Sequence, residues 1–138
     1  MMNYTHTQEI HRGDVFMVDL GSVEDRENSL FAKKRMGICI SNELCNKHSQ
    51  ILSFVFLSSN ISQAKLKLPT RVFVSAVETG RKDSTVACEQ IVSVPRDSII
   101  RYVTKMSDDT MKKIDKKEAM IWVFWKDCII LRNIGKFC

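Results

Sequence analysis

The stretch Lys33-Lys34-Arg35-Met36-Gly37-Ile38-Cys39-Ile40-Ser41-Asn42 joins a basic loop to a short apolar strand that ends on Ser-Asn. The loop carries fixed positive charge, and the strand gives that charge a rigid base. Functional residues often lie on loops that a stiff element holds in place. We therefore expect the functional site at this junction, with the other elements arranged around it.

Further short strands are expected on both sides of this stretch. Runs rich in β-branched and aromatic residues, separated by turn residues, are typical of strands. The run at 51–58 is almost continuously apolar, which indicates a strand covered on both faces. A long surface loop is expected at 21–34, a polar connection at 43–50 and a linker at 59–69. The expected strands are residues 14–20, 36–42, 51–58, 70–74, 84–88 and 91–94. This number of short strands predicts a small barrel or a tightly curled sheet.

The pattern changes to a helical one after residue 106. Ser107 is a suitable N-cap, and the two aspartates that follow suit the positive end of a helix dipole. Apolar residues recur at helical spacing on one face and lysines occupy the other. The apolar positions are Met111, Ile114, Ile121, Trp122 and Trp125, and the lysines are 112, 113, 116 and 117. We expect an amphipathic helix whose lysine face is solvated; contact with a nucleic acid is the alternative.

Composition points to one globular domain. The chain has 138 residues, of which 44% are hydrophobic and 27% charged, so disorder is not expected. A net charge of +5 favours polyanionic partners, although basic surfaces are common. The N-terminus lacks the pattern of a signal peptide, and the most apolar segment, 119–131, is too short and too charged to span a bilayer. We expect a protein with no membrane association.

The cysteines and histidines do not predict a metal site or any other cofactor site. The five cysteines include no Cys-x-x-Cys pair, and the three histidines have no spacing typical of zinc ligands. Cys39, Cys88 and Cys128 lie in apolar runs, where buried free thiols are expected. Free thiols are compatible with a reducing cytoplasm.

Several motifs, taken in order, resemble one known family. Arg12-Gly13-Asp14-Val15-Phe16-Met17-Val18-Asp19-Leu20 is similar to the opening strand of the MazF/PemK/Kid toxins. The similarity continues through Arg35, Ile38 to Asn42, Asn46, Ser49, Leu68-Pro69-Thr70, Asp83-Ser84, Cys88-Glu89-Gln90-Ile91 and Ser107-Asp108-Asp109-x-Met111. The matches are collinear, and their order and spacing make the set specific. They divide the chain into a flexible leader (1–11), a toxin-like barrel with its helix (12–122) and a C-terminal extension (123–138).

The resemblance implies a mainly β fold, an SH3-like curled β-barrel with a C-terminal helix, usually as a homodimer. It implies a metal-independent endoribonuclease that acts on single-stranded RNA and is inhibited by a small acidic antitoxin protein. An arginine after the first long loop and a hydroxyl residue at the end of the third strand serve cleavage in this family. These roles fall on Arg35 and Ser58. By the same resemblance, Glu89 and Gln90 line the RNA groove. Lys33 and Lys34 are expected to attract the RNA strand by their charge. The other expected RNA-binding positions are Asn42, Ser59, Pro69 and Thr70.

The residue chemistry leaves alternatives open at each of these positions. Arg35 can grip two phosphate oxygens with its planar fork, or it can be a solvated surface arginine. Ser58 can donate a hydrogen bond to the phosphate, or it can cap a turn at the end of its strand. Asn42 can bind a base or hold the neighbouring loop, and Glu89 and Gln90 can read base edges or form a surface turn.

Two other functions remain compatible with the sequence. Family members usually have Gly-Gly and Pro around the arginine, where this chain has Lys33-Lys34 and Met36. That change favours a rival hypothesis, a nucleic-acid-binding or regulatory module without catalysis. A second rival is a toxin that targets DNA gyrase, because one fold can carry more than one activity.

Overall fold

The computed structural model describes residues 2–3, 8–21, 34–59, 61 and 68–122 of the chain. These residues form a seven-stranded antiparallel sheet in the order β1-β7-β2-β3-β4-β6-β5, with one long helix, α4, packed against it. The elements are β1 (Met2–Asn3), β2 (Asp14–Asp19), β3 (Lys34–Cys39), α1 (Glu43–His48), β4 (Ile51–Ser58), β5 (Arg71–Val74), α3 (Ala76–Thr79), β6 (Ser84–Pro95), the 3-10 turn η2 (Arg96–Ser98), β7 (Ile99–Lys105) and α4 (Asp108–Trp122). The mainly β class with a C-terminal helix is confirmed.

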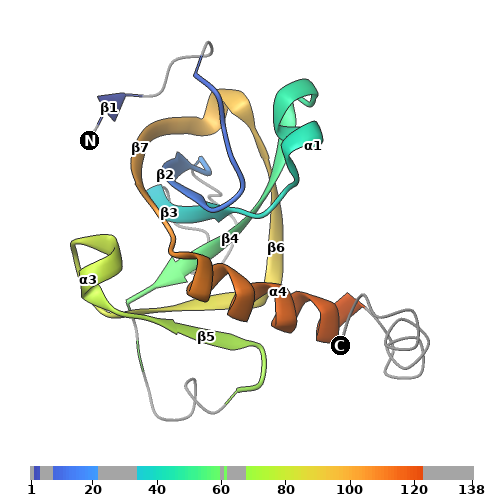
Figure 1. Cartoon of the computed structure of the whole chain (residues 1–138). Coiled ribbons are helices and arrows are strands. Elements are labelled where there is room, and N and C mark those ends of the chain that lie inside the picture. The colour runs from blue at the N-terminus through green and yellow to red at the C-terminus, as the bar shows by residue number, and fades with distance from the viewer. Residues whose placement is uncertain (1, 4–7, 22–33, 60, 62–67, 123–138) are drawn as a thin grey trace.

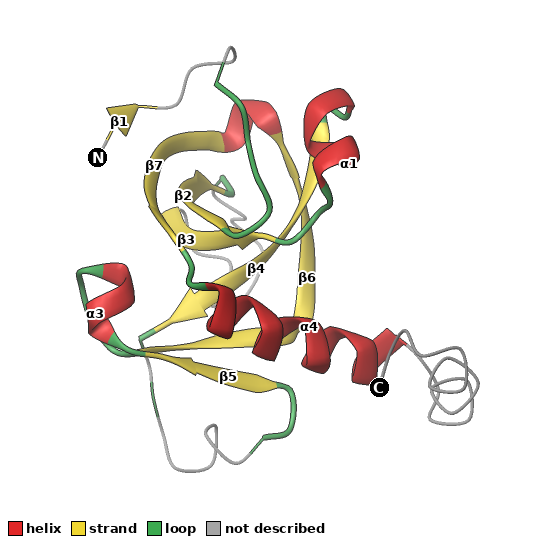
Figure 2. Cartoon of the chain, viewed as in Figure 1, coloured by secondary structure: helices red, strands yellow, loops and turns green. Residues whose placement is uncertain are grey.

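The sheet is strongly curled, as the ribbon shows where β7, β2 and β3 bend around one another (Figure 1). Pairing between the described strands leaves β1 and β5 as the two edges, so the curl is not closed by hydrogen bonds. Figure 2 shows the strands, the helices and the loops that connect them in separate colours. In the described residues, no helix is long and apolar enough to cross a membrane.

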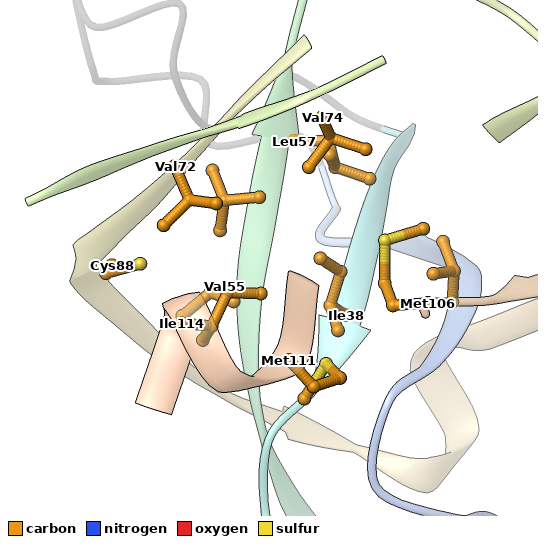
Figure 3. Packing of buried hydrophobic residues seen from close by; sticks show 11 residues of the cluster. Ile38, Val55, Leu57, Val72, Val74, Cys88, Met106, Met111 and Ile114 are labelled. Carbon is orange, nitrogen blue, oxygen red and sulfur yellow. The ribbon is translucent and has the colours of Figure 1, made fainter. Parts of the chain in front are cut away.

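Two hydrophobic cores lie on opposite faces of β4. The helix-side core consists of Val15, Ile38, Val55, Leu57, Val72, Val74, Val86, Cys88, Met106, Met111 and Ile114. Figure 3 shows how Met111 and Ile114 of α4 reach the strand residues Ile38 and Val55. The strand-side core consists of Ile10, Phe16, Val18, Cys39, Leu52, Phe54, Phe56, Val94 and Ile99. The prediction that strand 51–58 is covered on both faces is therefore confirmed.

The N-cap of α4 forms as its sequence predicts. Thr110 N donates to Ser107 Oγ at 3.2 Å, which satisfies a backbone donor of the first turn. Glu78 of α3 joins the same corner, since its carboxylate accepts from Ser107 N and from Thr110 Oγ1. Of the apolar positions, Met111 and Ile114 are buried and Ile121 packs beside them, whereas Lys112, Lys113 and Lys116 are exposed. The side chain of Trp122, and Trp125 as a whole, lie outside the described residues.

Several boundaries differ from the sequence prediction. The polar connection 43–50 contains the short helix α1, because Asn42 caps it and Glu43 occupies its first turn. The two strands predicted at 84–88 and 91–94 form a single strand, β6. Strand β7 was not predicted. The strand expected at 36–42 runs from Lys34 to Cys39. The segment expected as a flexible leader is held at two points, since Met2–Asn3 pairs with β7 and Ile10 is buried.

The cysteine prediction is confirmed for the two predicted thiols that lie in the described residues. Cys39 and Cys88 are free and buried, while Cys45 on α1 is free and exposed. Burial raises the pKa of the Cys88 thiol to about 12, so this thiol stays protonated and packs as an apolar group. Cys128 lies outside the described residues.

Candidate functional site

Arg35 lies near the start of β3, with its guanidinium over the ring of Phe56. The distance from Arg35 Cζ to the ring centroid is 5.7 Å, which is within the range of a cation–π contact. Arg35 Nη2 also donates to the backbone oxygen of Leu57 at 3.2 Å. Two contacts to β4 therefore hold the guanidinium in one orientation before any ligand arrives.

Ser58 lies at the end of β4, next to this guanidinium. The β3–β4 pairing ends with Gly37 opposite Phe56, and beyond it Arg35 Nη2 donates to the backbone oxygen of Leu57, the residue before Ser58. Side chains two residues apart on a strand point to the same face, so Phe56 and Ser58 share a face. The structure thus brings the two residues predicted for cleavage together.

An irregular stretch of β6 faces Phe56. Val55 pairs with Ile91 and Leu57 with Val86, so residues 87–90 stand opposite Phe56 alone. Bulges of this kind bend a strand, re-aim its side chains and are frequent beside functional sites. Here the bulge contains Glu89 and Gln90, two of the predicted RNA-binding residues. Cys88 N donates to Thr70 O at 3.1 Å, which ties the bulge to the start of β5.

Arg71 is a second arginine at this location, and no sequence pattern indicated it. Its Nη2 lies 3.0 Å from Glu89 Oε1, and its side chain is only 10% exposed. Burial lowers the pKa of the Arg35 guanidinium, and the nearby charge of Arg71 lowers the pKa further. Arginine remains protonated in proteins, so the site holds two fixed positive charges near one carboxylate. We refer to Arg35, Ser58, Arg71 and Glu89 as the arginine cluster.

The remaining predicted site residues fall into two groups. Lys34, Ser59 and Pro69 are exposed beside the arginine cluster, and Thr70 and Gln90 are partly exposed there. Asn42 lies beyond the other end of β3, on the order of 20 Å away at strand spacing. Its side chain accepts from Cys45 N at 2.9 Å, so it caps α1 and is not part of the cluster. Lys33 lies outside the described residues.

A pocket of about 440 Å³ lies elsewhere, between the segment 8–11, α1 and Arg96. None of the predicted site residues lines it. His11 Nδ1 lies 2.9 Å from Glu43 Oε2 at the edge of this pocket, and this hydrogen bond raises the pKa of His11. In the part of the chain that the structure describes, no group of three potential metal ligands was found.

The His11–Glu43 contact predicts a small pH dependence of stability. The pKa of His11 is raised in the folded state. The stabilisation that protonated His11 gives the folded state is therefore complete below the unfolded pKa of 6.5, and it is lost as pH rises through the higher folded pKa. Both side chains are about half exposed, so solvent screening limits the free energy to a few tenths of a kcal/mol. We expect His11→Gln to flatten urea-unfolding stability measured between about pH 6 and about pH 8. Equal pH slopes in wild type and variant would contradict this account.

The fold and the cluster define a class: a small curled β protein that presents two arginines and a hydroxyl on one sheet face. Residues 11–120 match the model of the "PemK-like, MazF-like toxin of type II toxin-antitoxin system" family. The chain belongs to this family. A curated relative, Endoribonuclease EndoA of Bacillus subtilis (strain 168), is 30% identical over 108 residues, covering 78% of this chain and 89% of that protein.

Solved structures share the fold. An endoribonuclease from a mycobacterial species, in complex with its cognate antitoxin, superposes with a TM-score of 0.66 at 21% identity, covering 81% of this chain and 93% of that one. MazF from Deinococcus radiodurans superposes with a TM-score of 0.67 at 11% identity, covering 85% and 99%. At these identities the likeness concerns the fold.

Proposed function

We propose that this toxin is an endoribonuclease that cleaves single-stranded RNA without a metal ion. The observation that supports the proposal most directly is the position of Arg35, fixed over Phe56 and next to Ser58. The family supports it as well, because the Bacillus subtilis relative is named an endoribonuclease.

The chemistry uses the substrate's own nucleophile. The ribose 2′-oxygen attacks the adjacent phosphorus and loses its proton, and the 5′-oxygen of the next nucleotide leaves and gains a proton. The products are a 2′,3′-cyclic phosphate and a 5′-hydroxyl. The protein must orient the phosphate and stabilise the charge of the pentacoordinate intermediate.

Arg35 and Ser58 suit these tasks in different ways. The planar guanidinium of Arg35 can donate two parallel hydrogen bonds to phosphate oxygens, and its orientation is already set by β4. Because arginine remains protonated, the main task of Arg35 is to stabilise the negative charge on the phosphate. Ser58 can donate one further hydrogen bond to the phosphate. The exposed Lys34 adds long-range attraction for the RNA strand, which weakens as salt rises.

The test is cleavage of an unstructured RNA by the purified wild-type chain in excess EDTA. We expect cuts at short preferred sequences, with 2′,3′-cyclic phosphate ends that mass spectrometry identifies. An otherwise identical RNA with a 2′-deoxyribose at the cut position should stay intact. Binding of RNA without any cleavage would instead favour the non-catalytic module.

We also propose a small acidic antitoxin protein as partner, a homodimer and a cytoplasmic location. A mycobacterial relative was solved with its cognate antitoxin, and a Deinococcus radiodurans relative as a MazE–MazF complex. The positive net charge of this chain complements an acidic partner.

A further inference from the structure

Arg71 lies on the edge strand β5, on the face away from the helix-side core. Val72 and Val74 point into the helix-side core, so the alternate residues Arg71 and Phe73 lie on the other face of the strand. Arg71 pairs in register with Ala87, two residues before Glu89 on the bulged part of β6. The bulge thereby brings the Glu89 carboxylate to within 3.0 Å of Arg71 Nη2.

Two buried polar atoms on this face lack a hydrogen-bond partner within the described structure. They are Nε of Arg71 and Oγ1 of Thr85. Thr85 is fully buried and pairs with Ser58 on one side and Phe73 on the other, so it lies between β4 and β5. An unsatisfied buried donor is costly, and a ligand that accepts its hydrogen bond removes this cost.

The arginine cluster also has more positive than negative charge. Arg35 and Arg71 lie close enough to repel each other, and Glu89 balances one of the two charges. Two guanidinium groups on one sheet face match a chain of phosphates, because each can hold a separate phosphate with two hydrogen bonds. Strand order places β4 and β6 between β3 and β5, so the two arginines come from strands that are not neighbours. Arg35 is held by Leu57 O and Arg71 by Glu89, so each guanidinium has its own protein partner and can bind its own phosphate.

We propose that Arg71 binds an RNA phosphate neighbouring the scissile one, and that Glu89 orients Arg71 for this contact. This inference rests on the proposed function. It changes the role of Glu89 from reading a base to positioning a guanidinium. It also assigns β5, the edge strand, to substrate binding.

The test measures binding of an uncleavable RNA, with 2′-deoxyribose at the cut position, at several salt concentrations. Loss of one phosphate contact on a single strand makes the slope of log affinity against log salt shallower by about 0.7. We expect Arg71→Gln to show this change in slope together with about tenfold weaker binding. Arg71→Lys should keep the slope because it keeps the charge, but it should not restore full affinity.

Two further variants separate this role from a structural one. Arg81→Gln removes the same charge from an exposed turn and should leave the slope unchanged. Glu89→Gln should weaken binding without changing the slope, since Arg71 keeps its charge but loses its orientation. If Arg71→Gln does not fold by circular dichroism, the comparison of Arg71→Lys and Glu89→Gln with wild type decides the question.

The possible failures can be distinguished. If wild type neither binds the uncleavable RNA nor cleaves the natural one, the proposed function itself is wrong. If wild type does both and Arg71→Gln binds with unchanged affinity and slope, only the role of Arg71 is wrong. If Arg71→Gln lowers only kcat and leaves binding unchanged, the proposed role is also wrong, because Arg71 would then act at the scissile phosphate.

Discussion

Replacing Arg35 with alanine is expected to slow RNA cleavage by about 10²–10³-fold while the protein stays folded. The guanidinium is held over Phe56 and against Leu57 O, so it meets the developing charge on the phosphate without reorganising. Alanine removes that stabilisation, and neither Ser58 nor a lysine on the loop can replace a planar fork. The fold should survive because Arg35 is only partly buried and its contacts to Phe56 and Leu57 O lie near the end of β4.

The measurement is the single-turnover rate at saturating RNA, with thermal unfolding of the same samples to verify the fold. Lys34→Ala is the matched control, since Lys34 is exposed, carries a positive charge and directly precedes Arg35. It should weaken binding at low salt and leave the rate at saturation near wild type. Arg35→Lys should remain strongly impaired because a point charge cannot grip two oxygens. Unchanged cleavage by Arg35→Ala would remove Arg35 from the reaction.

Much of the fold follows from local sequence patterns. The continuous apolar run of β4 predicted a strand covered on both faces, and Ser107 predicted the start of α4. The errors lie where polar residues interrupt a regular element. The sequence predicts a break at Glu89-Gln90 between strands 84–88 and 91–94, whereas β6 continues through these residues as a bulge. The bulge depends on pairing with Phe56, which no local pattern reveals.

The sequence also predicted some of the site residues and missed others. Arg35 and Ser58 follow from the order of the family's motifs, and the hydrogen bond from Arg35 to Leu57 O places the guanidinium near Ser58. Asn42 was assigned to RNA binding because it follows the same strand, but its distance along that strand separates it from the cluster. Arg71 was not identified because its role depends on Glu89, which lies on another strand. Only the pairing of β5 with β6 brings these residues together.

Gly37 links the stability of the fold to the geometry of the site. It lies on β3 in register with Phe56, and a Cβ atom there would lie 2.9 Å from Phe56 Cε1 and 3.0 Å from Phe54 Cδ1. Both rings belong to the strand-side core and cannot move freely, because Phe54 also packs edge-on against Phe16. Glycine is therefore required by the close approach of two strand-side aromatic rings.

We expect Gly37→Ala to lower the free energy of unfolding by about 1–3 kcal/mol, the usual cost of overpacking a core. Urea titration measures this loss. Since the displaced ring of Phe56 supports the Arg35 guanidinium, cleavage at saturating RNA should also fall in molecules that remain folded. The double variant Gly37→Ala/Phe56→Leu supplies the control, because a smaller side chain at 56 makes room for the added methyl group.

The double variant should be more stable than the sum of the two single changes predicts, which is the sign of a direct steric conflict. It should not recover full activity, because leucine offers no aromatic face to the guanidinium. Recovery of stability without recovery of rate would separate the two roles of Phe56, as a core residue and as the support of Arg35. If the losses of stability in the two single variants simply add up in the double variant, the methyl group at 37 does not press against Phe56. The contact between β3 and β4 would then not fix the position of Arg35.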